Sequence, residues 1–310
     1  MFDCFAKDEY LYVVLPYFNY CNYNNRKKLF IEFVKRISKI DGIRIVVSEA
    51  KLDTNDTFYL PNIEGVHMHF KTTTKHMIWI KENLINIAVS KLPKTWKYMA
   101  WIDADLNFAN ESWVTDTKTA LKLFDVVQLF ESCANLGPNG EVIKVDRSFG
   151  YMYNKSGQSY HPKAKYGFWH PGFCWAIRRS AYDKLSGLVD FAILGSGDRH
   201  MALALIGKVD FSAPGNIHEG YTRKLREFQD KCKGLTLGYV PGTILHYWHG
   251  RPADRRYVER WDIITKGRYD PFTDIYKASN GKIRLTKNGE RLAQLLCEYF
   301  VGRNEDTMTV

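Results

Sequence analysis

The stretch Tyr98-Met-Ala-Trp-Ile-Asp-Ala-Asp-Leu-Asn-Phe108 joins a short apolar run to two aspartates that are separated by one residue. The run 99–102 is too short for a helix and shows no amphipathic period, so it predicts a buried strand. Asp103 and Asp105 then follow the carboxyl end of that strand, where open α/β sheets place their ligand crevices. Because side chains two residues apart in an extended segment point the same way, we expect both carboxylates to face one target. Carboxylates are the ligands that Mg²⁺ and Mn²⁺ prefer, so the stretch predicts a metal–diphosphate site. The alternative is a pair of solvated turn aspartates.

Outward from this stretch, predicted strands and helices alternate along the chain. Strands are predicted at 10–15, 43–47, 66–70, 126–130 and 173–178, and helices at 26–40, 77–90, 113–124, 180–185, 198–206 and 221–231. The helix after Arg26, for example, carries Leu29, Phe33 and Ile37 on one face. Such alternation predicts an α/β fold with a mixed, mostly parallel sheet flanked by helices.

One long segment, 131–168, breaks the alternation, because Gly, Asn, Ser, Tyr and Lys dominate it and no periodicity survives. It is predicted to be a long loop, and loops of this length inside a compact domain usually serve function. We expect it to close as a lid over a bound donor.

Composition narrows the class of protein. The 310 residues are 45% hydrophobic and 15% aromatic, which indicates a folded chain rather than a disordered one. The net charge of +10 favours an anionic partner, which is either nucleic acid, an anionic surface or a phosphorylated substrate. The six cysteines show no metal-binding spacing and are expected to be reduced. No signal-peptide layout and no long apolar run is present, so a cytoplasmic protein is expected, with its oligomeric state open.

Two further motifs carry groups that suit catalysis. The turn Gly195-Ser-Gly-Asp198 delivers an acid to the first turn of a predicted helix. Asp198 is either a catalytic acid or base, or a first-turn residue that complements the helix dipole. His246 and His249, spaced i and i+3 after an apolar stretch, are either metal ligands or half-buried hydrogen-bonded histidines.

Together, these three motifs in this order resemble the metal-dependent nucleotide-sugar glycosyltransferases of the GT-A fold. The chain is similar to the β-1,4-galactosyltransferases and to the galactosyltransferase-like part of polypeptide N-acetylgalactosaminyltransferases, from about residue 11 to 250. The resemblance implies that Asp105 binds Mn²⁺ (or Mg²⁺) and that Asp103 contacts the nucleotide-sugar.

The same resemblance extends to three other parts of the chain. A basic residue and an Asn lie on the family's helix before Asp-x-Asp, as Lys81 and Asn86 do here. His246 and His249 keep the spacing of the family's Met-x-x-His metal ligands. The Gly-Ser-Gly-Asp turn lacks the tryptophan and the acidic run of the family's counterpart. With Asp198 in that place, the resemblance implies a general base in an inverting transfer.

Other candidates have a structural alternative of equal standing. Trp175 is expected either to wall the donor sugar or to fill the core. Asn19 and Arg26 follow the first strand, where the related enzymes bind base and ribose, although a plain polar loop is the other interpretation. Arginines of the C-terminal part either clamp phosphates or form a solvated basic face; they are Arg251, Arg255, Arg256 and Arg260.

The sequence therefore predicts a GT-A catalytic domain over 1–250, with a donor half at about 1–130 and an acceptor half at about 165–250. A basic extension, 251–310, is expected to pack on it. The predicted activity is transfer of a sugar from a nucleoside-diphosphate-sugar, such as a UDP-sugar, to a hydroxyl acceptor such as a glycan. The alternatives are an aspartyl-phosphate-type phosphatase and a non-catalytic carbohydrate- or nucleic-acid-binding module.

Overall fold

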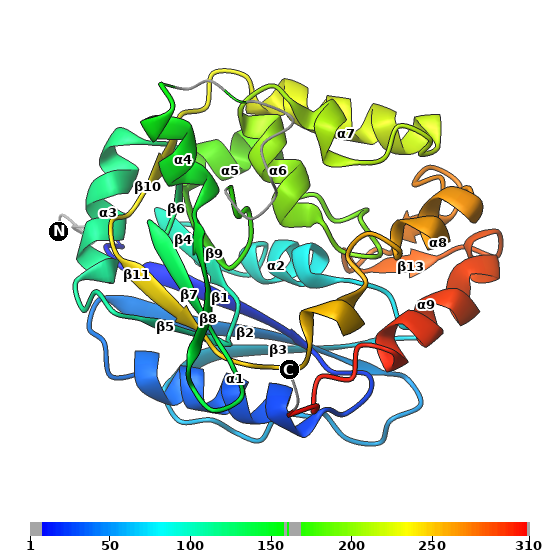
Figure 1. Cartoon of the computed structure of the whole chain (residues 1–310), viewed down its shortest axis with the longest axis horizontal. Coiled ribbons are helices and arrows are strands. Elements are labelled where there is room, and N and C mark those ends of the chain that lie inside the picture. Colours follow the sequence, from blue (N-terminus) through cyan, green and yellow to red (C-terminus); the bar gives the residue numbers. More distant parts are fainter. Residues whose placement is uncertain (1–7, 158–159, 161–168, 309–310) are drawn as a thin grey trace, which may run out of the picture.

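The computed structural model describes residues 8–157, 160 and 169–308. Its centre is a 7-stranded sheet with the order β10-β6-β9-β4-β1-β2-β3 (Figure 1). β9 runs antiparallel to both of its neighbours, and the other strands share one direction. The predicted mixed, mostly parallel sheet flanked by helices is therefore confirmed. The strands are β1 (Leu11–Phe18), β2 (Ile43–Leu52), β3 (Val66–Thr74), β4 (Tyr98–Ile102), β6 (Val126–Gln128), β9 (Cys174–Arg178) and β10 (Leu237–Tyr239).

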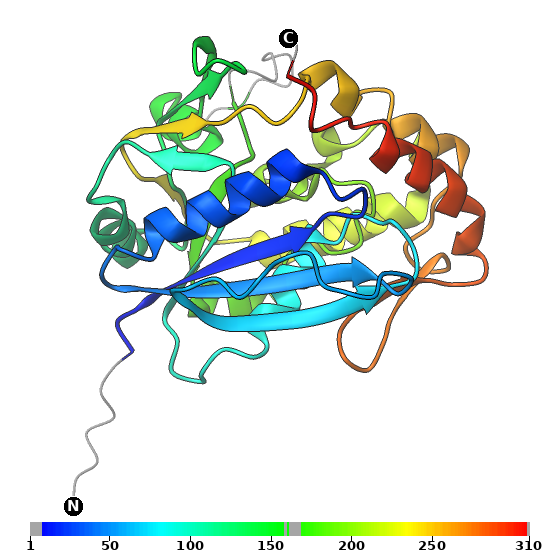
Figure 2. The same cartoon turned by 90° about the horizontal axis from the view of Figure 1, so that it is seen from below.

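Helices cover both faces of this sheet, which is why β1 is buried along nearly its whole length. On one face α1 and α3 pack on alternate strand residues such as Val13 and Val47, and Figure 2 shows α1 lying along β1. On the other face α2 packs on β1 and β2, α5 packs on β9, and α6 and α7 complete the same core cluster as Val14 and Val46. These helices are α1 (Asn24–Ile37), α2 (Lys81–Val89), α3 (Trp113–Leu123), α5 (Arg179–Leu185), α6 (Gly197–Leu205) and α7 (Glu219–Cys232).

A second, 4-stranded sheet with the order β5-β11-β7-β8 follows directly from the Asp-x-Asp turn. Its strands are β5 (Leu106–Phe108), β7 (Ser132–Leu136), β8 (Val142–Arg147) and β11 (Thr243–His246). β11 lies between β5 and β7, so His246 pairs with Leu106 on one side and with Asn135 on the other. This sheet therefore brings the end of β11 beside Asp105.

The prediction of a structureless loop at 131–168 was wrong for its first part. β7 and β8 form a hairpin there, and α4 (Phe149–Lys155) follows it. β7 is ordered by pairing with β11, a strand far along the chain, which no local pattern could reveal. The rest of the predicted lid, 158–159 and 161–168, lies outside the described residues.

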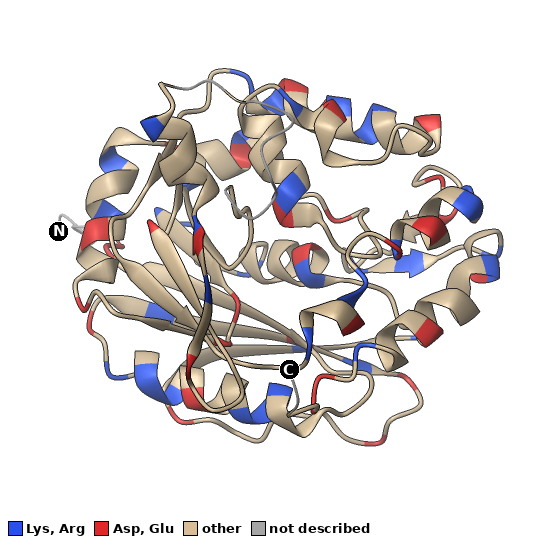
Figure 3. Ribbon diagram, viewed as in Figure 1, with Lys and Arg blue, Asp and Glu red and all other residues tan. Residues whose placement is uncertain are grey.

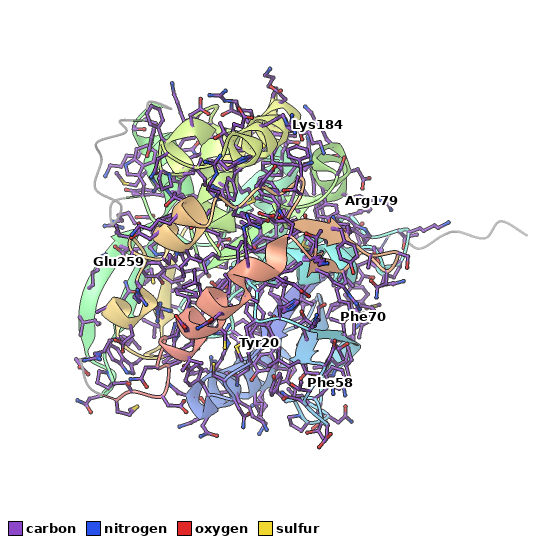
Figure 4. All side chains as sticks on the ribbon, turned by 90° about the vertical axis from the view of Figure 1, so that its right-hand side faces the viewer. Tyr20, Phe58, Phe70, Arg179, Lys184 and Glu259 are labelled. Carbon is purple, nitrogen blue, oxygen red and sulfur yellow. The ribbon has the colours of Figure 1, made fainter. Side chains whose placement is uncertain are left out.

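The C-terminal part adds α8 (Trp261–Lys266), a small hairpin of β12 (Ile275–Lys277) and β13 (Ile283–Leu285), and α9 (Ala293–Val301). Short 3₁₀ turns lie at Val209–Ser212, Pro252–Arg255 and Gly289–Leu292. α9 packs Phe300 against Tyr20, and both belong to the main core cluster (Figure 4). The division into donor half, acceptor half and extension stays a prediction. In the part of the chain that the structure describes, none of the helices has the length and apolar character needed to cross a membrane.

Candidate active site

Asp105, His246 and His249 converge at the junction of the two sheets. Their ligand atoms all lie within 4.8 Å of one another. Asp105 Oδ2 is 3.0 Å from His249 Nε2 and 3.9 Å from His246 Nε2, and the two Nε2 atoms are 3.1 Å apart. The other oxygen, Asp105 Oδ1, is buried and has no hydrogen-bond partner among the described residues. One carboxylate and two imidazoles so arranged suit a divalent ion, and the orphaned oxygen fits such an ion as well.

A neighbouring amide fixes which nitrogen of His246 faces this cluster. Asn135 Nδ2 donates to Asp146 Oδ2 at 2.9 Å, so Asn135 Oδ1 is the atom that lies 2.9 Å from His246 Nδ1. An oxygen can only accept, so Nδ1 carries the proton and Nε2 keeps its lone pair for a metal. Burial lowers the pKa of His246 well below its usual value and also lowers that of His249. Both rings are therefore neutral at physiological pH, which is the form that binds metals.

The charge of Asp105 matches this arrangement. Burial by itself would raise the pKa of Asp105, but the hydrogen-bonding contact with His249 and the positive charge of Arg255 hold it well below the usual range. The carboxylate is therefore ionised at any physiological pH, as a metal ligand has to be.

A second cluster forms around the buried Lys81, the first residue of α2. Its Nζ lies 2.7 Å from Asp103 Oδ1 and 3.1 Å from Asp198 Oδ2. Burial opposes the charge of Lys81, but Asp103 and Asp198 outweigh that effect and raise its pKa above the usual value. The lysine therefore stays charged and links the Asp-x-Asp turn to the Gly195–Asp198 turn.

The two aspartates of Asp-x-Asp do not share one target, contrary to the expectation from strand geometry. β4 ends at Ile102, so Asp103 and Asp105 lie in a turn rather than in an extended segment. Asp103 faces Lys81, whereas Asp105 faces the histidines. Burial, partly offset by Lys81, raises the pKa of Asp103 to about 6.

The turn that carries Asp198 requires its glycines. Gly195 and Ser196 have positive φ angles of 89° and 74°. A Cβ on Gly197 would lie 2.2 Å from Glu82 Oε1, so that position has no room for a side chain. These constraints place Asp198 in the first turn of α6, with its side chain 21% exposed.

Glu82 belongs to this cluster, although the sequence analysis did not single it out. It is only 5% exposed, and its Oε1 has no hydrogen-bond partner in the described part of the chain. Burial, helped by the charge of Asp198, raises the pKa of Glu82 to about 8. The carboxyl is therefore mostly protonated at neutral pH. The signal in the sequence was an acid beside Lys81 at the start of a helix that carries no other charged residue.

The remaining predicted donor-binding residues have structural partners elsewhere. Asn19 bonds to Tyr17 in β1 and to Tyr23 at the start of α1, and Asn86 bonds to Leu188, Tyr182 and Asp190. Trp175 is fully buried in β9, where its indole N–H donates to the Pro171 carbonyl, so the core alternative describes it. Arg26 pairs with Glu305 at 2.8 Å. None of these four residues contacts either cluster directly, although Glu305, the partner of Arg26, interacts with His249.

No protein-family model and no curated protein matches the sequence. Among solved structures, the catalytic domain of Drosophila β1,4-galactosyltransferase 7 in complex with xylobiose is 13% identical, with 93% of this chain and 98% of that chain covered and a TM-score of 0.40. A mutant of that enzyme in complex with manganese, UDP-Gal and xylobiose is 12% identical, with the same coverage and a TM-score of 0.42. A nucleotide-diphospho-sugar transferase from Desulfovibrio desulfuricans, so described on a provisional basis, is 8% identical over 93% of this chain and 97% of that chain, with a TM-score of 0.34. These values are low, so the chemistry proposed next rests on the site residues.

Proposed function

We propose that the protein is a metal-dependent glycosyltransferase of the GT-A type, which moves a sugar from a nucleoside-diphosphate-sugar to a hydroxyl acceptor. The observation that carries this proposal is the adjacency of the two clusters at the end of β4. A metal-ligand triad around Asp105 lies two residues along the chain from Asp103 of the Lys81–Asp103–Asp198 cluster. Sugar transfer needs both a cation for the departing diphosphate and a base for the acceptor hydroxyl.

The triad of Asp105, His246 and His249 is the set that would hold the ion. Two imidazoles and one carboxylate favour Mn²⁺ over Mg²⁺, which prefers oxygen ligands and keeps several waters. When bound, such an ion neutralises the charge that develops on the leaving diphosphate. Neither the phosphatase nor the nucleic-acid-binding alternative accounts for two histidines that converge on Asp105.

Asp198 is the base in this proposal. Its Oδ2 lies 3.1 Å from Lys81 Nζ, and partial exposure leaves the carboxylate open to an acceptor. In an inverting transfer, Asp198 takes the acceptor hydroxyl's proton while that oxygen attacks the anomeric carbon on the face opposite the diphosphate. Asp103, whose side chain is 32% exposed, is placed to accept hydrogen bonds from donor hydroxyls while Lys81 holds one of its oxygens.

Isothermal titration calorimetry with UDP tests the proposal. We expect UDP to bind in the presence of Mn²⁺ and to lose most of its affinity with chelator or in Asp105→Ala, because an oxygen ligand is removed. Asp262→Ala, which removes an exposed carboxylate from α8, is the matched control and should bind as the wild type does. A screen of nucleotide-sugars for slow Mn²⁺-dependent hydrolysis would then identify the donor. UDP binding that ignores both Mn²⁺ and Asp105, or binding of polynucleotide instead, would refute the proposal.

A further inference from the structure

Four arginines, Arg26, Arg255, Arg260 and Arg303, gather where the C-terminal part meets the candidate active site, and two of them share a single buried carboxylate. Arg26 Nη1 and Arg303 Nε lie 2.8 Å and 2.6 Å from the two oxygens of Glu305. Glu305 is 1% exposed, and its charge is shared by these two guanidinium groups. Arg255 and Arg260 are therefore left to find other partners.

Arg255 and Arg260 are nearly buried, at 9% and 8% exposure, yet all their hydrogen-bond partners are neutral. Arg255 contacts the Tyr257 hydroxyl at 3.1 Å and the His249 ring at 2.8 Å. Arg260 donates to Ser196 Oγ at 2.7 Å and to the Tyr299 hydroxyl at 3.3 Å. Over residues 8–157, 160 and 169–308, neither guanidinium has a carboxylate within 4.0 Å, and Arg255 Nε is buried without a partner. Burying a cation without a counter-charge is costly, so this pair calls for an anion.

The pKa of Tyr257 is sensitive to the positive charge of the arginines around it. Burial of that hydroxyl favours a raised pKa, although the side chain as a whole is 44% exposed. Arg255, Arg303 and Arg260 outweigh burial and lower the pKa of Tyr257 below its usual value. A site that stabilises a phenolate also stabilises phosphate oxygens.

The acids nearest in the chain do not neutralise the pair. Asp254 forms its ion pair with Arg251, and Glu259 lies at the surface, away from the core (Figure 4). The charge of Arg255 contributes to the lowered pKa of Asp105, but Asp105 Oδ2 faces the histidines rather than this guanidinium. More widely, Lys and Arg are spread over the whole ribbon among acids, so these buried arginines are not part of a general basic face (Figure 3).

Each of the two arginines also contacts one part of the candidate active site. Arg255 contacts His249 of the metal-ligand triad, and Arg260 contacts Ser196 in the turn that carries Asp198. Arg255 Nη2 lies 2.8 Å from His249 Nε2, the atom whose lone pair an ion would need, and 3.1 Å from His249 Nδ1, so metal binding would compete with the shorter of these two contacts.

We infer that Arg255 and Arg260 form a binding site for the diphosphate of the nucleotide, additional to the metal-ligand triad. Guanidinium forks match phosphate oxygens in geometry and make charge-assisted hydrogen bonds. The inference rests on the proposed function for the identity of the ligand, a nucleoside diphosphate. It assigns part of the diphosphate's affinity to the protein's own cations rather than to an ion.

Calorimetry with inorganic pyrophosphate in EDTA isolates this contribution. We expect wild-type protein to bind pyrophosphate without metal, and Arg255→Gln and Arg260→Gln each to weaken binding by about 10–100-fold. Arg251→Gln, which removes a half-exposed arginine paired with Asp254, is the matched control and should change nothing. The affinity for UDP should fall in parallel with the affinity for pyrophosphate in both variants, whereas the affinity for uridine should stay unchanged.

Thermal unfolding separates ligand binding from a structural role. Because Arg255 and Arg260 have no acidic partner in the described part of the chain, their Gln variants should unfold at the wild-type temperature or above. Arg303→Gln, which breaks the pair with Glu305, should unfold at a lower temperature. No pyrophosphate binding by the wild type in EDTA, unchanged affinity in both variants, or a drop in Tm like that of Arg303→Gln would overturn the inference. Arginine-dependent pyrophosphate binding without any nucleotide-sugar turnover would instead refute the proposed function and leave the anion site standing.

Discussion

Replacing Asn135 with alanine tests the metal-ligand triad without touching a ligand. Asn135 Oδ1 accepts from His246 Nδ1 at 2.9 Å, which holds the ring and keeps its Nε2 unprotonated. Without that acceptor, the neutral ring can place its proton on either nitrogen and can rotate. Loss of such an orienting partner typically lowers metal affinity by about 10–100-fold, which corresponds to roughly 1.4–2.7 kcal/mol.

The assay is calorimetric titration of Mn²⁺ into wild type, Asn135→Ala and Asn139→Ala. Asn139 is exposed in the turn of the same β7–β8 hairpin, so it controls for loss of an amide from this element. We expect the Mn²⁺ dissociation constant to rise about 10–100-fold in Asn135→Ala alone, with far-UV circular dichroism unchanged. Wild-type Mn²⁺ affinity in Asn135→Ala would show that His246 is not a ligand held in this way.

Three further predictions concern the neighbouring carboxyl groups. Asp198→Asn should lower sugar transfer by roughly 10²–10⁴-fold and leave Mn²⁺-dependent UDP binding intact, and near-normal turnover would place the base elsewhere. Burial opposes ionisation of Glu305, but Arg26 and Arg303 hold its pKa well below the ordinary 4.5, so its stabilising contribution is present above pH 4.5 and is lost as pH falls. Glu305→Gln should therefore cost about 3 kcal/mol at pH 7 in urea unfolding, and the difference should shrink toward pH 3; a constant difference would contradict this. Burial raises the pKa of Glu82 from 4.5 to about 8, so the wild type loses stability as pH rises between these values. Glu82→Gln should thus gain in Tm relative to wild type from pH 5 to pH 8, and a pH-independent gap would show that Glu82 ionises normally.

Local sequence patterns were enough to predict the strand and the turns that carry Asp103, Asp105 and Asp198. A short apolar run followed by polar residues predicts a buried strand and its end, and the glycines before Asp198 predict a tight turn into a helix. These features depend on neighbours in the chain, so they can be read without knowing the fold. The hairpin of β7 and β8 could not, because its ordering partner β11 lies about a hundred residues further along the chain.

The candidate metal site also depends on contacts between distant segments that the sequence alone does not reveal. Resemblance to a family suggested His246 and His249, but only the pairing of β11 with β5 and β7 brings them to Asp105 and brings Asn135 to His246. Strand geometry even suggested the wrong orientation for Asp103, because the chain leaves the extended conformation at Ile102.

By itself, then, the sequence determined the alternating α/β architecture, the strand that ends in Asp-x-Asp and the glycine turn before Asp198. Tertiary structure decided which charges are paired: Lys81 lies between two aspartates. Among the described residues, Glu82 Oε1 has no hydrogen-bond partner, and the buried Arg255 and Arg260 have no acid within ion-pair distance. The physical reason is that backbone conformation follows largely from adjacent residues. Burial and charge compensation depend instead on distances through space, which are set only when segments remote in the sequence pack together.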